Sequence, residues 1–253
     1  MSDNPTGANL SEINQRLVKQ YNEIAQLAGA LAHEIKNPLS VIGMNVELLA
    51  EDLVEADSPA ARRALTKVDI VQKQCQRLQN LLDDFLGFAR VRHLDLTPAS
   101  LNDQIERVLN LFAPQAKECS IEIVRFLNPD LPLIMLDEQT LQGALVNLVK
   151  NAIEAMPNGG LLTARTHVTR TGVALDLIDT GQGMEQGTAM HMFETFYSTK
   201  DNGSGLGLPT ARKSIEAHGG LINVESALGR GTKFTVEFPM PTRLASHEAN
   251  AEN

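Results

Sequence analysis

The chain has 253 residues, which at roughly 150 residues per domain predicts two small domains or one large one, and its 43% hydrophobic content is too high for a disordered chain. Its formal net charge of −9 argues against a nucleic-acid binder, which needs a positive surface. Two cysteines, Cys75 and Cys119, exclude a disulfide framework and favour a reducing cytoplasm, and no apolar run approaches the ~18 residues of a membrane span.

Two long amphipathic helices are predicted in the first ninety residues. Apolar side chains recur there every three or four positions, which is typical of one helix face. The pattern stops at EADSPAA, where Ser58 followed by Pro59 indicates the start of a second helix. Pro38 lies inside the first helix and predicts a kink or loosening nearby. The two stripes consist of Ile24, Leu27, Leu31, Ile35, Leu39, Ile42, Val46, Leu49 and Leu53, then Leu65, Val68, Val71, Cys75, Leu78, Leu82, Phe85 and Ala89.

A hairpin of two such helices cannot bury a continuous apolar face by itself. Two copies bury it as a four-helix bundle, so we expect a homodimer with an isologous interface. The alternative is that the stripes pack against the second domain.

His33 lies on the opposite side of the first helix from the stripe. It follows Ile24 by nine positions, about 180° away at ~100° per residue, so it is predicted to point at solvent. Asn37 follows one turn later, and Glu34 lies to the side. An exposed imidazole beside a carboxylate is a candidate nucleophile, because the carboxylate accepts the proton of one ring nitrogen while the other attacks. The alternative is an ordinary surface histidine.

The rest of the chain predicts an α/β layer domain without regular βαβ alternation. Helices are predicted at LNDQIERVLNLFAPQAK, at DEQTLQGALVNLVKNAIEAM with Asp137 as N-cap, and up to about Ala217, ending at Gly219-Gly220. The stretch 181–207 is glycine-rich and irregular, and the tail after Pro241 is predicted to be disordered. Strands are predicted at IEIVRF, LPLIMLD, LLTARTHV, GVALDLID, LINVES and TKFTVEF.

One helix of this domain carries a polar face. Asn147 and Asn151 are four positions apart and face the same way, with Lys150 between them and Glu154 after them. Such a face is usually just solvated. Its amide oxygens are also suitable ligands for Mg²⁺, which binds oxygen donors together with substrate phosphates.

Two glycine-containing motifs follow. DTGQGM places Asp179 at a strand end, where it forms either a tight turn or a pocket carboxylate that accepts from an exocyclic amine. GSGLGL opens a helix, which makes an anion site, and Lys200 just before it adds a positive charge. The glycine order differs from the dinucleotide fingerprint, and no P-loop motif occurs in the sequence.

These motifs together resemble the catalytic core of two-component sensor histidine kinases, of a style similar to soluble kinases of the nitrogen-regulation kind. Each motif alone is weak, whereas five in the family order, over about residues 27–239, are specific. They are the phosphoacceptor box LAHEIKNPLSVI, the asparagine box NLVKNAIEA, and the nucleotide boxes DTGQGM, FETFYSTK and GSGLGLPTARKSIEAHGG, with GRGTKFTVEFP as a last glycine motif.

The fold class that the resemblance implies is α + α/β: a helical hairpin forming a dimeric four-helix bundle, followed by a two-layer α/β sandwich. The sandwich is an ATP-binding domain of the type shared with gyrase, Hsp90 and MutL. The expected domains are an N-terminal tail and helix start (1–22), a dimerisation and histidine phosphotransfer domain (23–95), a catalytic ATP-binding domain (96–241) and a disordered tail (242–253).

The resemblance further implies an ATP-dependent protein-histidine kinase that autophosphorylates His33 and transfers the phosphoryl group to an aspartate of a response regulator. Glu34 would be the general base. Asn37 would position water for dephosphorylating that regulator.

ATP and Mg²⁺ are the implied cofactors. Asn151 and Asn147 would hold the metal, Asp179 would hydrogen-bond the adenine amine, and Thr232 would support a water network around adenine. The other positions implied to form the nucleotide site and its mobile lid are Lys150, Gly181, Gly183, Met184, Lys200, Gly203, Gly205, Leu206, Gly207 and Leu208.

Two alternatives remain. One is a dimeric scaffold that docks a response regulator and acts mainly as its phosphatase. The other is a gyrase-type ATPase, which needs a catalytic acid where Asn147 stands.

The lid departs from the family pattern at Thr195 and at Tyr197-Ser198. About 20–25 residues precede the phosphoacceptor region. We therefore expect a cytosolic sensor protein or the short N-terminal helix to deliver the signal, unless the chain is a truncated core.

Overall fold

The computed structural model describes residues 29, 32, 34–54, 58–89, 94–200 and 203–240. The chain divides into two compact units. One comprises the described residues up to 89 together with residues 200 and 203–206, and the other comprises residues 94–199 and 207–240. The first is helical and the second is a mixed α/β sheet domain, which confirms the fold class predicted from the sequence.

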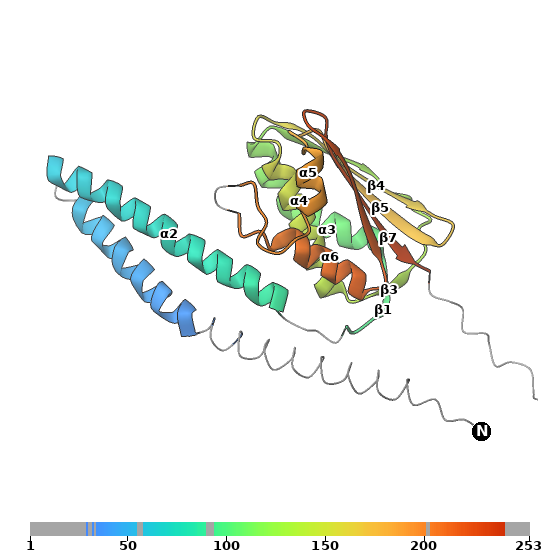
Figure 1. Ribbon diagram of the computed structural model, residues 1–253, viewed down its shortest axis with the longest axis horizontal. Helices are drawn as coiled ribbons and strands as arrows, with labels where there is room; N and C mark the ends of the chain where they lie inside the picture. The colour runs from blue at the N-terminus through green and yellow to red at the C-terminus, as the bar shows by residue number, and fades with distance from the viewer. Residues whose placement is uncertain are drawn as a thin grey trace, which may run out of the picture. The chain divides into compact units, whose positions relative to one another are not determined.

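The first unit contains a helix over residues 34–54 and the helix α2 (Pro59–Ala89) (Figure 1). Ser58 begins α2, because its Oγ accepts a hydrogen bond from the N–H of Ala61 at 3.1 Å. The predicted N-cap with proline at the first helical position is therefore confirmed. The first helix continues through Pro38 without a break.

An ion pair joins the two helices. Lys36 Nζ lies 2.9 Å from Asp83 Oδ1, and both side chains are about half exposed. Such exposed pairs contribute little stability, ~0–1 kcal/mol, so the hairpin depends on its apolar contacts.

The apolar stripe of the hairpin is only partly covered. Leu39, Val68 and Cys75 are buried. Other positions of the predicted stripe stay between 39% and 49% exposed, namely Ile35, Ile42, Leu49, Val71 and Leu78. The described part of one hairpin therefore leaves a large share of this face in contact with water.

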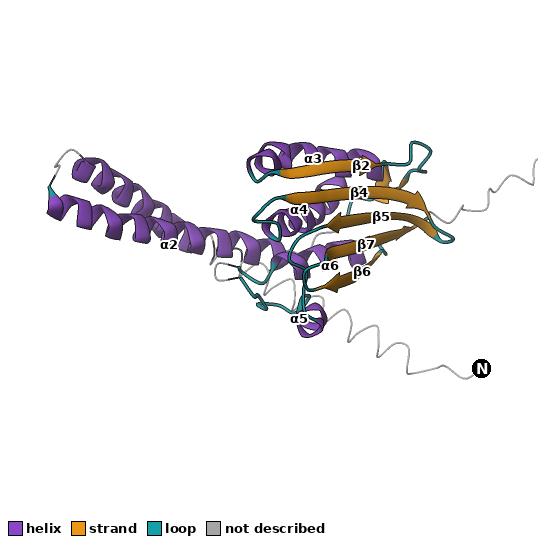
Figure 2. Cartoon of the chain, turned by 90° about the horizontal axis from the view of Figure 1, so that it is seen from above, coloured by secondary structure: helices purple, strands orange, loops and turns teal. Residues whose placement is uncertain are grey.

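The second unit is built on a five-stranded sheet with the strand order β2-β4-β5-β7-β6 (Figure 2). β2 pairs with β4 in parallel, and the remaining neighbours are antiparallel. The bounds are β2 Ile121–Phe126, β4 Gly160–Val168, β5 Gly172–Asp179, β6 Leu221–Ala227 and β7 Gly231–Pro239. A separate two-stranded sheet pairs β1 (Thr97–Ala99) with β3 (Ile134–Leu136).

Helices α3 (Leu101–Glu118), α4 (Glu138–Glu154) and α6 (Gly207–Ala217) cover one face of the sheet (Figure 1). The short helix α5 (Gln186–His191) lies in the stretch that was predicted to be irregular. Alternate strand residues point at the helices and form the core. Two of the rows across β5, β7 and β6 are Leu175–Val236–Ile222 and Leu177–Phe234–Val224.

Asp137 joins three segments of the second unit. Its Oδ1 accepts from the N–H of Thr140 at 2.8 Å, which confirms the predicted N-cap of α4, and its Oδ2 accepts from the N–H of Asp95 at 3.0 Å. The Asp137 N–H donates to Nε2 of His218 at 3.0 Å, and Nδ1 of His218 lies 2.7 Å from the carbonyl oxygen of Ser214. The imidazole therefore carries its proton on Nδ1 and fastens the end of α6 to the start of α4.

Replacing Asp137 tests the strength of this junction. The hydrogen bond from the Thr140 N–H, more than that from Asp95, lowers the pKa of Asp137. The charged form therefore stabilises the fold fully above the ordinary pKa of aspartate, about 4, and this contribution is lost as the pH falls through the lowered value. We expect Asp137→Ala to lose about 1 kcal/mol in urea unfolding at pH 7.

The loss should shrink as the pH falls below about 4. Asp137→Asn is the matched control, because its amide oxygen still caps α4, and it should lose less than the alanine variant. Equal unfolding free energies for the wild type and Asp137→Ala at pH 7 would contradict the prediction.

Candidate functional site

Two aspartates on β5 are buried, and they lie on opposite faces of the sheet. Asp176 and Asp179 are 1% and 3% exposed and are three positions apart, so their side chains point in opposite directions. A buried carboxylate is costly unless partners compensate its charge. The partners of each aspartate therefore indicate whether its role is structural or functional.

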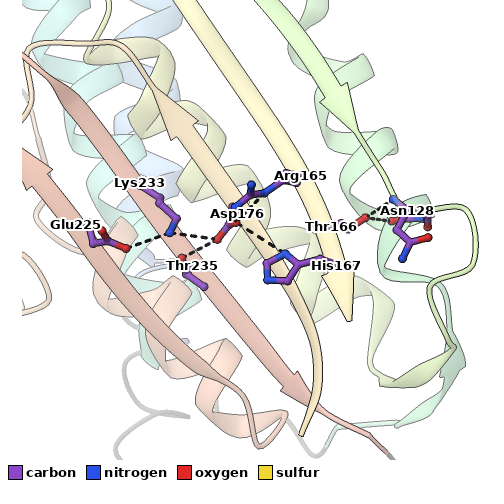
Figure 3. A network of polar contacts seen from close by, with 9 residues as sticks. Asn128, Arg165, Thr166, His167, Asp176, Glu225, Lys233 and Thr235 are labelled. Carbon is purple, nitrogen blue, oxygen red and sulfur yellow. Dashed lines mark hydrogen bonds and ion pairs between the residues drawn. The ribbon is translucent and has the colours of Figure 1, made fainter. Parts of the chain in front are cut away.

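Asp176 is compensated by its neighbours on β4 and β7 (Figure 3). Arg165 Nη2 lies 2.6 Å from Oδ2, Lys233 Nζ lies 3.8 Å from Oδ1, and Thr235 Oγ1 donates to Oδ1 at 2.7 Å. Burial alone would raise the pKa of Asp176, but these partners hold the pKa below its ordinary value. Asp176 thus ties three strands together and needs no ligand.

Asp179 has a different environment, with no cation paired to it among the described residues. The N–H groups of Gly181 and Thr232 both donate to Oδ1, at 2.9 Å and 3.2 Å, and no described residue donates to Oδ2. Burial raises the pKa of Asp179, and the two N–H donors oppose the shift. A buried carboxylate with one oxygen left without a donor is a candidate acceptor for an N–H of a ligand.

Asp179 belongs to a polar row that continues the apolar rows of the sheet. Thr232 on β7 is its cross-strand partner, and Ser226 on β6 is the partner of Thr232. Ser226 Oγ lies 3.0 Å from Thr232 Oγ1. Asp179 and Thr232 were predicted as site residues, whereas Ser226 was not. Ile222, Val224 and Ser226 are two positions apart on one strand, so their side chains share a face. This alternation is the sequence signal that would have found Ser226.

Glycines bring the loop after Asp179 against its neighbours. Gly183 has φ +64°, and a Cβ there would lie 2.0 Å from the carbonyl oxygen of Ala227. A Cβ on Gly181 would lie 2.5 Å from the carbonyl oxygen of Ala155. Gln182, between them, donates its N–H to that same Ala155 oxygen at 3.0 Å. Only glycine permits these two approaches, so the loop stays close to the end of α4.

Helix α4 contributes the asparagine pair. The amide oxygen of Asn147 would lie 3.5 Å from a Cβ on Gly207, so half-buried Asn147 stands beside the start of α6. Asn151 lies one turn later and Lys150 is exposed. The described residues contain no cluster of three or more His, Cys, Asp or Glu side chains that could hold a metal ion.

The other predicted residues fall in three places. Gly207 and Leu208 begin α6, and Met184 follows the glycine loop, where its N–H donates to Ser226 Oγ at 2.9 Å. Lys200, Gly203, Gly205 and Leu206 are grouped with the first unit, whereas the other residues of the predicted nucleotide site belong to the second. The contacts of these four residues with phosphates therefore stay a prediction.

The predicted phosphoacceptor His33 lies outside the described residues. Glu34 and Asn37 are exposed on the first helix, and the predicted exposure of His33 stays a prediction.

Gly183 offers a direct test of the loop. We expect Gly183→Ala to destabilise the second unit by about 3 kcal/mol, because alanine is strained at positive φ and its Cβ overlaps the Ala227 carbonyl. Gly187→Ala is the matched control, since a Cβ there meets nothing within 4 Å. Thermal unfolding should show a much lower melting temperature for the first variant only, and similar melting of both variants would contradict the clash.

No helix in the described ranges is both long and apolar enough to cross a membrane.

Comparison with known proteins places two families on the chain. Residues 23–94 match the His Kinase A (phospho-acceptor) domain, and residues 136–242 match the family described as Histidine kinase-, DNA gyrase B-, and HSP90-like ATPase.

Similar curated proteins include sporulation kinase C of Bacillus subtilis, 30% identical over 91% of this chain and 53% of its own length. Sensor histidine kinase ZraS of Escherichia coli is 32% identical over 86% of this chain and 46% of its own length. The chain therefore spans about half the length of these relatives.

Solved structures are similar as well. Full-length ShkA in complex with AMPPNP has a TM-score of 0.66 and 31% identity, over 86% of this chain and 46% of that chain. The catalytic domain of histidine kinase ThkA has a TM-score of 0.53 and 31% identity, over 58% of this chain and 96% of that one. Histidine kinase ThkA in complex with response regulator protein TrrA has a TM-score of 0.65 and 25% identity, over 94% and 68% of the two chains.

Proposed function

Because the chain belongs to the family of sensor histidine kinases, we propose that it is an ATP-dependent protein-histidine kinase that phosphorylates its own His33 and passes the phosphoryl group to an aspartate of a response regulator. The observation that carries this proposal is Asp179, a buried carboxylate with one unused oxygen and no paired cation in the described part of the chain. The complex of the similar kinase ThkA with TrrA supports a response regulator as the partner.

Asp179 suits the exocyclic amine of adenine. Its Oδ1 is fixed by two backbone N–H groups, so Oδ2 is held in one orientation without using a side chain. An ionised carboxylate only accepts hydrogen bonds, and the adenine amine only donates in this plane, so the two are complementary. The AMPPNP complex of the similar kinase ShkA supports ATP as the nucleotide.

Asn147 and Asn151 would hold Mg²⁺ together with the phosphates of ATP. The metal would neutralise negative charge on the triphosphate. Asn147 stands beside Gly207, where α6 begins with N–H groups that have no helical partner and favour an anion. The lid residues Lys200, Gly203, Gly205 and Leu206 would close over the phosphates.

The hairpin would supply the nucleophile. One imidazole nitrogen of His33 attacks the γ-phosphorus, the bond from that phosphorus to the bridging oxygen breaks, and ADP leaves. Glu34 accepts the proton from the other ring nitrogen. Glu34 is exposed on the first helix, so its carboxylate is accessible for this role.

We also propose that the hairpin forms a homodimer. Within the described part of one hairpin, Ile42, Leu49 and Leu78 remain 46–49% exposed. A second copy offers the same apolar surface, and an isologous four-helix bundle would bury both. A cytoplasmic location, where ATP and response regulators meet, completes the proposal.

Labelling with γ-labelled ATP and Mg²⁺ tests the kinase. The wild type should acquire a label that is labile in acid and stable in alkali, and His33→Gln should bind ATP normally but acquire no label. Asp179→Asn should keep Oδ1 as an acceptor but turn Oδ2 into a donor, so ATP affinity should fall about 100-fold. An acid-stable label, or a label that persists in His33→Gln, would overturn the proposal.

A phosphatase activity toward the response regulator is the second candidate, favoured by the exposure of Asn37, four positions after His33 in the sequence. Its amide would position the water that attacks the aspartyl phosphate. We expect Asn37→Ala to slow dephosphorylation of the regulator about 100-fold while autophosphorylation is retained. Unchanged dephosphorylation would exclude this role for Asn37.

A further inference from the structure

The hydroxyl of Ser226 has three partners, more than any other hydroxyl near Asp179. It lies 2.9 Å from the N–H of Met184, 3.0 Å from the carbonyl oxygen of Gly231 and 3.0 Å from Oγ1 of Thr232. A serine hydroxyl has one proton and two acceptor positions, so these three contacts use all of its capacity.

The direction of each hydrogen bond follows from these partners. The Met184 N–H can only donate, and the Gly231 carbonyl can only accept, so the single proton of Ser226 goes to Gly231. The contact between Ser226 and Thr232 must then use the proton of Thr232. Thr232 has given its only proton to Ser226, so its Oγ1 offers only lone pairs to a ligand or to water.

Thr232 and Asp179 are direct cross-strand partners on the inner face of the sheet. Asp179 offers its Oδ2, which receives no hydrogen bond from a described residue, and Thr232 offers a hydroxyl oxygen whose proton is committed. This end of the site therefore presents acceptors on both strands. This pair of acceptor oxygens suits a 6-amino purine, because the amine donates two hydrogen bonds. It repels a 6-oxo purine, whose carbonyl oxygen would face two acceptors.

We propose that Ser226 is a positioning residue that sets the nucleotide specificity of the site, by holding the Thr232 hydroxyl as an acceptor and so favouring adenine over guanine nucleotides. Ser226 acts through Thr232 and needs no contact with the base. The inference rests on the proposed ATP site and adds to it the residue that controls discrimination between purines.

Removing the Ser226 hydroxyl should free the proton of Thr232. In Ser226→Ala the threonine hydroxyl can rotate and donate to the carbonyl of guanine, so the penalty against guanine falls. We expect the preference for ADP over GDP, measured by calorimetry with Mg²⁺ on the full chain, to fall about tenfold. Diphosphates avoid turnover during the measurement. Ser226→Thr, which keeps a hydroxyl, should retain the wild-type preference.

Repeating the substitution in a Thr232→Val variant distinguishes positioning of the Thr232 hydroxyl from general damage to the fold. Thr232→Val has no hydroxyl proton to direct, so adding Ser226→Ala to it should leave the ratio of the two affinities unchanged. If Ser226→Ala does not fold, Ser226→Cys replaces it, because a thiol hydrogen-bonds only weakly.

Each outcome decides the matter. A wild type that binds neither nucleotide would refute the proposed ATP site itself. A wild type that prefers ADP, with Ser226→Ala retaining that preference or weakening both nucleotides equally, would overturn the role of Ser226 while leaving the ATP site intact. The role of Ser226 would also be overturned if Ser226→Ala lowered the preference for ADP over GDP as much in the Thr232→Val background as in the wild type.

Discussion

The candidate site depends on two backbone N–H groups that share one carboxylate oxygen. Gly181 and Thr232 both donate to Oδ1 of Asp179, and this double hydrogen bond orients the carboxylate without a side-chain partner. A cation at the same place would hold the side chain equally well, but it would also cancel the charge that a ligand needs. Holding the group through the backbone keeps it both fixed and available.

The constraint extends to the surrounding chain. A donor at Gly181 requires the loop to turn back immediately after β5, and that turn lies against the carbonyl of Ala155 at the end of α4. The same loop then meets β6 at Ala227, where Gly183 is at positive φ. The glycines therefore serve the geometry of Asp179 as much as any direct approach of a ligand. The contrast with Asp176 on the same strand shows that the residue type alone does not determine the role of a buried carboxylate.

Much of the fold follows from local signals in the sequence. Ser58 and Asp137 cap their helices because a side-chain oxygen reaches an N–H three residues later, and Gly219 adopts the positive φ expected just beyond a helix end. Asp179 was also predictable, since an acid at the end of an apolar strand and before two glycines is a local pattern. The motif resemblance then added the roles that spacing leaves open.

The remaining features depend on pairing between distant segments. β1 exists only through its register with β3, and its three residues carry no strand pattern of their own. The hydrogen bond from Asp137 to His218 joins residues 81 positions apart. Ser226 matters because β6 pairs with β7 in a register that places it beside Thr232. Local propensity contains no information on such registers, so these contacts required the structure.

Helix α6 contacts α4 at both of its ends, and this restricts how α6 can move. Gly207 at the start of α6 stands beside Asn147, and His218 just beyond its end is bound at Asp137, ten positions earlier on α4. The two helices therefore run antiparallel, with contacts about 15 Å apart along α4. Sliding α6 by one helical turn, ~5.4 Å, would break the His218 bond and move Gly207 away from Asn147. The two contacts therefore fix the position of α6 along α4, and α6 can move along its axis only together with α4.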